Sequence, residues 1–158
     1  MLPALAPPHT RTDAAAGNAS TTGAHPDATS TEGATTIAAP DAALQQVLEL
    51  DGALAIALVD LGSGMALATR NVVPFDLELA AAVNTEVVRA ELRAIESLGL
   101  REQIEDILIT LSGQYHLIRL SSRPDLAGVF SYLVLDRRRS NLALARRALK
   151  ALEDQLEL

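Results

Sequence analysis

The sequence has no cysteine and no tryptophan, and it holds only two phenylalanines and two tyrosines. Without cysteine, the chain forms no disulfide and offers no thiolate as a nucleophile or zinc ligand. This composition fits the reducing cytoplasm, where we expect the protein to reside. The scarcity of aromatic side chains argues against a binding site that stacks planar ligands.

The sequence also lacks long apolar runs and any stripe of basic residues. No uninterrupted apolar segment approaches the roughly 18 residues that a membrane-spanning helix needs. Prolines interrupt the first 13 residues, which therefore do not resemble a secretory signal. Because the formal net charge of −7 repels phosphate backbones and anionic lipid, we expect neither nucleic acid nor a membrane as partner.

Large aliphatic residues are rare at the N-terminus. Residues 1–38 are mostly Ala, Thr, Pro, Ser, Gly, Asp and His. Such a segment buries too little apolar surface to offset the entropy that is lost on ordering. We predict a disordered tail over residues 1–38 and one folded domain over residues 39–158.

Apolar spacing and capping residues predict three helices in the folded part. Asp41 caps a short helix that ends before Gly52. A long helix runs from Leu77 to about Leu98, where Asp76 caps its start and Gly99 stops it. Ser140 or Asn141 caps a last helix. Its single apolar stripe comprises Leu142, Ala145, Leu149, Leu152 and Leu156.

Five apolar runs predict strands, at residues 53–60, 65–70, 105–113, 115–122 and 128–136. The glycine-bearing turn Asp60–Gly64 joins the first two as a hairpin, and a turn around Gly113–Gln114 joins the third and fourth. Because runs 53–60 and 128–136 are apolar on both sides, helices must cover both faces of the sheet.

The order of these elements and several motifs resemble the Roadblock/dynein-light-chain family from roughly Asp41 to Leu156. The motifs are Asp51–Gly52 before the first strand, the turn Asp60–Gly64, the long alanine-rich helix, Gly113 between the third and fourth strands, and Asn141 before the last helix. The tail of 38 residues has no counterpart in the minimal family domain.

The resemblance implies an α/β (α+β) fold of three layers. A five-stranded antiparallel sheet in the order 2-1-5-4-3 has the long helix on one face and the two terminal helices on the other. It also implies a homodimer, in which the edge strand from Ile104 to Leu111 pairs with its copy and the long helices pack together. Bacterial branches of the family commonly serve a small Ras-like GTPase, which is the partner that the resemblance implies.

The residues of the predicted helix Leu77–Leu98 form a wider apolar arc than an ordinary surface helix has. The bulkier part suits the sheet and comprises Leu77, Ala81, Val88, Leu92 and Ile95. The part with smaller side chains suits a second helix and comprises Leu79, Ala80, Val83, Val87, Ala90, Ala94 and Leu98. Glu78, Thr85, Arg89, Arg93 and Glu96 occupy the solvent-facing side.

Asn84 and Glu91 lie at the seam between these two apolar parts. They either fix the register of a symmetric dimer, with Glu91 meeting the partner's Arg89, or point to solvent. The dimer hypothesis assigns nine residues to the interface: Leu79, Val83, Asn84, Val87, Ala90, Glu91, Ala94, Ile107 and Ile109. The alternative is that one protomer covers both parts of the helix.

The folded part offers no set of nucleophile, base and orienting residue. Its one histidine, His116, alternates with Ile118 and Leu120 on a predicted strand, where a half-buried structural role outweighs that of a ligand or base. The turn Asp60–Gly64 lacks the spacing and the lysine of a phosphate-binding loop. We therefore predict no catalytic residue, no cofactor and no metal.

Arg137, Arg138 and Arg139 form the one concentrated basic run. They precede a predicted helix N-terminus, where positive charge is mildly unfavourable. They are either a docking point for an acidic partner, such as the GTPase itself, or a solvated turn whose arginines meet nearby carboxylates.

From the sequence we predict a non-catalytic, homodimeric adaptor or regulator that binds a small Ras-like GTPase in bacterial signalling, with a GTPase-activating or scaffolding role. The alternatives are a small-ligand sensor domain and a purely structural dimerisation scaffold. The sensor is an alternative because a three-layer domain can enclose a pocket.

Overall fold

Two strands that are apolar on both faces form the centre of the fold, β1 (Ala53–Asp60) and β5 (Val129–Asp136). The computed structural model describes residues 40–157, so the tail predicted for residues 1–38 lies outside the described residues. The outer strands are β2 (Ala66–Asn71), β3 (Asp106–Thr110) and β4 (Gln114–Leu120). All pairings are antiparallel and the order is β2-β1-β5-β4-β3, as predicted.

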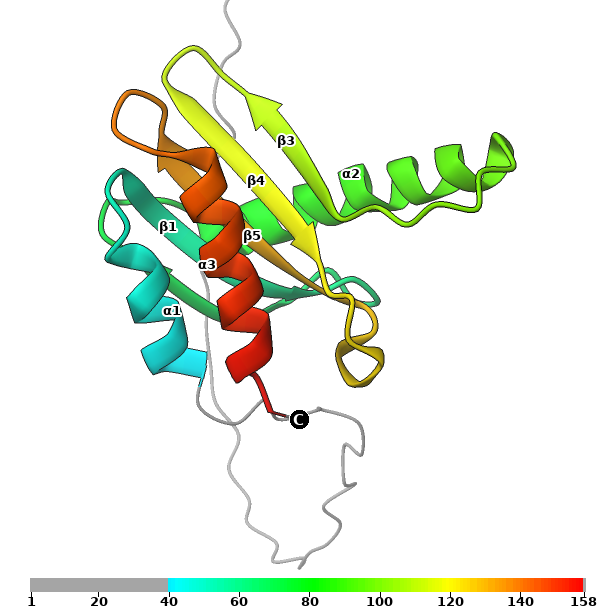
Figure 1. Cartoon of the computed structure of the whole chain (residues 1–158), viewed down its shortest axis with the longest axis horizontal. Coiled ribbons are helices and arrows are strands. Elements are labelled where there is room, and N and C mark those ends of the chain that lie inside the picture. The colour runs from blue at the N-terminus through cyan, green and yellow to red at the C-terminus, as the bar shows by residue number, and fades with distance from the viewer. Residues whose placement is uncertain (1–39, 158) are drawn as a thin grey trace, which may run out of the picture. The chain divides into compact units, whose positions relative to one another are not determined.

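Helices cover both faces of the sheet, which confirms the predicted three-layer fold. Helices α1 (Pro40–Leu48) and α3 (Leu142–Gln155) lie side by side on one face, and α2 (Leu77–Ser97) lies on the other (Figure 1). A short 3-10 helix, η1 (Pro124–Leu126), lies in the connection between β4 and β5.

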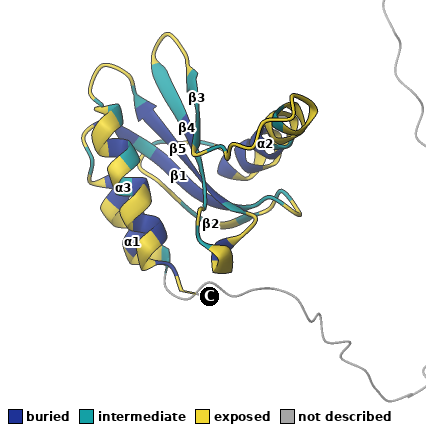
Figure 2. Ribbon diagram, turned by 45° about the vertical axis from the view of Figure 1, so that its right-hand side comes forward, coloured by how far each residue is buried: buried dark blue, intermediate teal, exposed yellow. Residues whose placement is uncertain are grey.

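The sheet separates two hydrophobic cores (Figure 2). On the side of α1 and α3, β1 contributes Ile56 and Leu58. On the side of α2, β1 contributes the smaller residues Ala55, Ala57 and Val59, which pack with the alanines at the start of α2. Small side chains on both surfaces allow the helix backbone to approach the sheet closely.

The ends of α2 and α3 follow the predicted capping residues, whereas Asp41, predicted to cap the first helix, lies inside the first turn of α1, which begins at Pro40. The carboxylate of Asp76 accepts a hydrogen bond from the Leu79 amide at 3.0 Å, and Gly99 adopts a φ of 65° after α2. At α3, the cap is Asn141 rather than Ser140, and its side chain accepts hydrogen bonds from the next helical amides. Strand β3 is shorter than predicted because the Leu111 amide turns to the Gln114 carbonyl and closes the hairpin.

Gly52 holds the start of β1 against the loop between β5 and α3. Its φ is 82°, and an added Cβ would lie 2.9 Å from the Ser140 nitrogen and 3.0 Å from the Arg139 carbonyl carbon. The Gly52 carbonyl also accepts a hydrogen bond from the Asp136 amide at 2.7 Å. A side chain at this position therefore meets both an unfavourable backbone conformation and fixed backbone atoms.

We predict that Gly52→Ala lowers the free energy of unfolding by about 2 kcal/mol or more, because the loop must move away from the new methyl group. Urea denaturation of the two proteins measures this difference. Gly113→Ala is the matched control, since its Cβ meets no atom within 4 Å. Equal losses in the two variants would contradict the steric explanation.

Candidate interaction surfaces

The first half of α2 packs on the sheet. Leu77, Ala81 and Val88 are buried as predicted. Thr85 was predicted to face solvent, and this prediction is wrong because only 1% of the residue is exposed. Its hydroxyl donates to the Ala81 carbonyl at 2.8 Å, and an added Cβ on Gly64 would lie 3.5 Å from that hydroxyl. The β1–β2 turn therefore covers this side of the helix.

Arg89 joins α2 to the same turn, while 38% of its side chain stays exposed on the side predicted to face solvent. Its guanidinium donates to the carbonyl oxygens of Leu61 and Gly62, both at 2.9 Å. Within the turn, the Ser63 hydroxyl and the Ser63 amide both donate to the Asp60 carboxylate. These bonds lower the pKa of Asp60, and the bond from the hydroxyl has the larger effect. The turn is a hairpin connection, as predicted, and Arg89 is engaged within its own protomer.

The second half of α2 extends past the sheet (Figure 1). Leu92 and Ile95 were predicted to pack on the sheet, but Leu92 is 37% exposed and Ile95 is only half-buried. The buried face of the helix ends at Val88 because no strand lies beneath the turns that follow. Helical periodicity assigned Leu77, Ala81 and Val88 correctly to the sheet, but it contained no information about how far the sheet extends beneath the helix.

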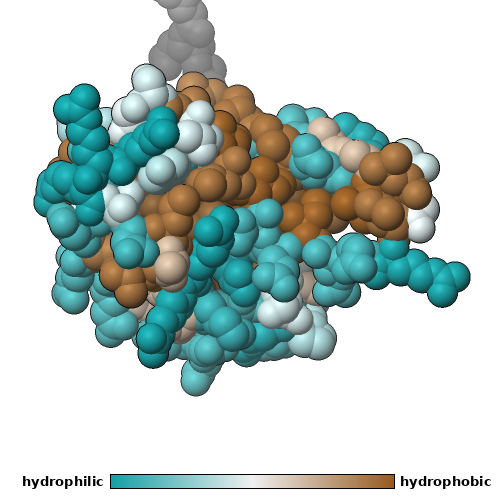
Figure 3. Space-filling model, turned by 45° about the horizontal axis from the view of Figure 1, so that its top comes forward, coloured by the Kyte–Doolittle hydropathy of each residue, from teal (hydrophilic) through white to brown (hydrophobic). Residues whose placement is uncertain are grey.

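The remaining apolar residues of α2 form an exposed surface. Leu79 is 60% exposed, Val83 is 53% exposed and Leu98 is 71% exposed. Of the other residues predicted for this part of the helix, Ala90, Glu91 and Ala94 are exposed, Val87 is half-buried, and Ala80 is buried against the sheet. Figure 3 shows apolar side chains continuing onto the projecting end of the molecule.

Asn84 is buried, with 7% of the residue exposed. Its amide nitrogen donates to the Ala80 carbonyl at 2.8 Å. Burial raises the pKa of Tyr132 on β5 to about 12, although the polar side chain of Asn84 opposes this shift. Asn84 therefore points into its own protomer and not to solvent.

The open edge of β3 lies beside the projecting half of α2. Ile107 and Ile109 are half-buried and share one face of the strand. Within the described residues, β3 pairs only with β4, so its other edge has no strand partner. A groove between α2 and this edge is lined by Glu91 and Ile95 on the helix and by residues 103–107.

His116 is half-buried and takes a structural place, as predicted. Its Nδ1 lies 2.9 Å from the Tyr132 hydroxyl, and its Nε2 lies 3.1 Å from the Gln114 side-chain oxygen. Phe75 contacts the ring edge-on at a centroid distance of 6.2 Å. Burial lowers the pKa of His116, so the folded protein favours the neutral ring.

The basic run lies in the exposed turn between β5 and α3. Arg137 stacks over the Tyr115 ring at 5.6 Å, and Arg139 forms an ion pair with Asp51 at 2.6 Å. The side chain of Arg138 makes no ion pair with any residue in the described range 40–157. Two of the three arginines thus have partners within the chain.

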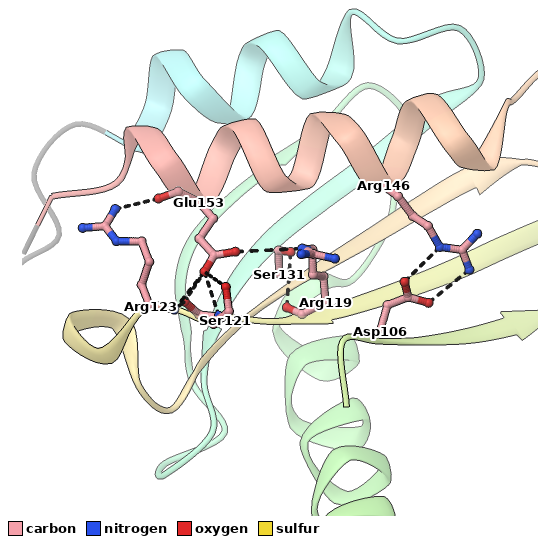
Figure 4. A network of polar contacts seen from close by, with 8 residues as sticks. Asp106, Arg119, Ser121, Arg123, Ser131, Arg146 and Glu153 are labelled. Carbon is pink, nitrogen blue, oxygen red and sulfur yellow. Dashed lines mark hydrogen bonds and ion pairs between the residues drawn. The ribbon is translucent and has the colours of Figure 1, made fainter. Parts of the chain in front are cut away.

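Polar contacts that the sequence did not predict fix α3 to the sheet (Figure 4). Glu153, in the last turns of α3, has only 6% of its surface exposed. One carboxylate oxygen accepts hydrogen bonds from the Ser121 hydroxyl at 2.7 Å, the Ser122 amide at 2.7 Å and the Arg123 amide at 3.1 Å. In return, Arg123 donates to the carbonyl oxygens of Glu153 and Leu156, which caps the helix.

Arg146 and Arg119 add charged contacts between α3 and the outer strands β3 and β4. Arg146 forms a two-pronged ion pair with Asp106 at the start of β3, at 2.9 and 3.1 Å. Arg119, the neighbour of Asp106 across β3 and β4, lies 3.9 Å from Glu153. The signal in the sequence was the position of Glu153 four residues after Leu149, on the apolar stripe of the helix. An acid on such a stripe requires a buried partner.

We predict that Glu153→Gln lowers the free energy of unfolding by about 2 kcal/mol near neutral pH, because an amide binds these donors less strongly and leaves Arg119 uncompensated. Burial alone would raise the pKa of Glu153, but the hydrogen bonds from Ser121, Ser122 and Arg123 outweigh it and lower the pKa.

Because the folded pKa is depressed, this stabilisation is present above the ordinary glutamate pKa of 4.5 and is lost as the pH falls below it. Urea unfolding across the acidic range should show the gap between wild type and Glu153→Gln closing as the pH falls. Asp154→Asn, at an exposed neighbour on α3, is the control. A gap that is independent of pH would contradict the prediction.

Within residues 40–157, no group of three or more His, Asp or Glu side chains is arranged to hold a metal ion. No helix in this part of the chain has the length and apolar character needed to cross a membrane. A small, partly open hollow between α3 and the sheet measures about 20 Å³ and is lined mostly by apolar residues, with Arg119 and Glu153 among its polar ones.

No protein-family model matches the sequence, and no curated protein matches it. Solved structures do match the fold. A Roadblock/LC7 domain from Streptomyces avermitilis aligns with a TM-score of 0.63 at 11% identity, over 72% of this chain and 91% of that chain.

Two structures of MglB are also similar. MglB from Myxococcus xanthus aligns with a TM-score of 0.62 at 18% identity, over 73% of this chain and 82% of that chain. The gliding protein MglB from Thermus thermophilus aligns with a TM-score of 0.58 at 17% identity, over 73% of this chain and 89% of that chain. Together with the strand order and the placement of the helices, these alignments show that the chain has the Roadblock/LC7 fold.

Proposed function

We propose that the chain is a non-catalytic homodimer that binds and regulates a small Ras-like GTPase. The observation that carries the proposal is the exposed apolar surface of α2 beside the open edge of β3. Helix α2 lies on the face of the sheet opposite α1 and α3, and β3 forms the adjoining edge. Both the apolar surface and the edge lack a partner within residues 40–157.

The exposed side chains of α2 supply the energy for association. Leu79 and Val83 are each more than half exposed, and they lie four residues apart on one side of the helix. Full burial of such a side chain contributes about 2 kcal/mol. In a symmetric dimer each residue is buried twice, so even a small patch yields a useful affinity.

The open edge of β3 would orient the two protomers, because it can pair with its copy. Its side chains between Ile107 and Ile109 are apolar and half-buried, and the strand contains no proline, no lysine and no bulge that would protect the edge. The opposite edge differs, because β2 has an irregular register with β1 and ends in polar residues. Of the two edges, β3 is therefore better suited to pair with its copy.

The proposal of a GTPase partner is based on the family resemblance. The sequence resembles Roadblock proteins, whose bacterial branches commonly serve a Ras-like GTPase, and the chain shares its fold with MglB. The alternative of a ligand sensor is weaker. The hollow between α3 and the sheet measures only about 20 Å³, whereas small-ligand sites usually measure about 300 Å³ or more and are mostly apolar. The two larger hollows, of about 530 and 520 Å³, are open surface grooves lined mostly by polar and charged residues.

We predict that Val83→Glu raises the dissociation constant of the dimer about 100-fold, because the two-fold axis places both introduced charges in an apolar contact. Analytical ultracentrifugation over a range of concentrations measures the constant. The monomer should stay folded, because 53% of Val83 is exposed within the protomer.

Gln45→Glu on α1 is the matched control, since it adds the same charge at an exposed position on the other face of the sheet. We expect it to leave the dimer intact. A wild-type protein that is monomeric at micromolar concentration would contradict the proposed dimer, as would equal effects of the two substitutions.

We also predict that the wild-type protein binds a Ras-like GTPase from its own organism and changes the rate of GTP hydrolysis. Calorimetry with the GTPase loaded with GDP or with a GTP analogue measures binding, and phosphate release measures turnover. Binding without altered turnover would indicate a scaffold. If neither is detected while the dimer persists, the GTPase assignment fails and the structural dimerisation scaffold remains.

A further inference from the structure

The charges of the domain are unevenly divided along the chain. Residues 40–105 contain 11 acidic and 4 basic side chains, whereas residues 106–157 contain 6 acidic and 8 basic ones. Five of the later basic residues, Arg137, Arg138, Arg139, Arg147 and Lys150, are exposed in the β5–α3 turn or on α3. The basic surface therefore lies on the opposite face of the sheet from α2.

The start of α3 lacks the acidic residue that the other two helices have. Asp41 lies in the first turn of α1 and Glu78 in the first turn of α2, but the first turn of α3 has no acidic residue. The partial positive charge of a helix N-terminus attracts anions and repels cations. Three arginines before α3 thus add to an unfavourable positive potential, which a carboxylate from outside the domain would reduce.

Only part of this positive charge is neutralised within the described residues. Arg138 and Arg147 have no carboxylate of residues 40–157 within ion-pair distance. The pair of Arg139 with Asp51 is largely solvent-exposed, at 63% and 72% of the two side chains. Exposed pairs of this kind contribute about 1 kcal/mol or less, so Arg139 can exchange Asp51 for another carboxylate at little cost.

An apolar groove lies at the same place. It measures about 200 Å³ and is lined by Leu50, Leu135 and Leu144, with Asp51, Arg139 and Asn141 among its polar residues. Leu144 is 54% exposed, although it lies on a helix whose other face is buried. Arg147 follows Leu144 by three residues, so the two side chains are neighbours on α3. The groove is smaller than the roughly 300 Å³ of a typical small-ligand site, which suits a side chain better than a cofactor.

We propose that this groove docks an acidic segment of a partner protein. An aliphatic side chain of the segment enters between Leu50, Leu135 and Leu144, and carboxylates on either side of it meet Arg138 and Arg147. The apolar residues provide the anchor, and the unpaired arginines select an acidic sequence. The proposal does not depend on the dimer or on the GTPase, because it uses other residues on the other face of the sheet.

The test uses the full chain and a labelled, blocked peptide of Asp and Glu with one central leucine. Fluorescence anisotropy measures affinity, and amide chemical shifts in NMR locate the site. We expect saturable binding that weakens with added salt, with shifts confined to residues 50–52 and 137–147. A peptide whose leucine is replaced by glycine should bind about tenfold more weakly.

Variants separate the charges from the apolar anchor. Arg138→Glu and Arg147→Glu should each weaken binding about tenfold, whereas Leu144→Ser should remove the preference for the leucine peptide. Arg93→Glu makes the same change of charge on α2 and should alter binding by less than about twofold. Thermal unfolding confirms that each variant is folded, as expected for exposed positions.

Three results would overturn the proposal. The first is the absence of saturable binding at low ionic strength. The second is an equal loss in Arg93→Glu, which would mean unspecific attraction to the basic residues. The third is a salt-sensitive assembly beyond a dimer that Leu144→Ser abolishes, which would identify a second copy of this chain as the occupant of the groove.

Discussion

The close packing of α2 on β1 is the contact on which the rest of the structure depends. Alanines meet on both surfaces, at Ala55 and Ala57 of the strand and at Ala80 and Ala81 of the helix. This contact brings the helix near enough for Arg89 and Thr85 to engage the β1–β2 turn. It also fixes α2 at its first half, so the second half must extend past the sheet with its apolar side chains uncovered.

The two faces of the sheet are consequently different in kind. On the face of α1 and α3, ion pairs and the hydrogen bonds of Glu153 attach α3 to the strands and to the β4–β5 connection. A buried carboxylate is costly to separate from its donors, so these contacts stabilise the position of α3 on the sheet. On the face of α2, apolar side chains remain exposed beside an open strand edge, and association with another surface is the physical means of covering them.

The shared fold supports the architecture of this protein, whereas its exposed side chains support the proposed partners. Identities of 11% and 18% with the Roadblock/LC7 domain and with MglB are enough to support the arrangement of helices and strands. They do not transfer a partner, because partners are recognised by side chains that differ at most positions. Leu79, Val83 and the β3 edge therefore support the proposed dimer, and the groove beside Leu144 supports the proposed acidic partner segment.

The sequence by itself determined the elements, because capping residues, glycines and apolar spacing act locally: Asp76, Gly99 and Asn141 end or begin helices where they were expected to. The strand order came from a family resemblance. Only the tertiary structure decided which apolar side chains are covered. Leu92 is uncovered and Thr85 buried, and Arg89 and Glu153 reach residues about 30 positions away in the chain. Helical periodicity assigns a residue to a side of its own helix, but burial depends on what lies opposite that side, which local sequence does not specify.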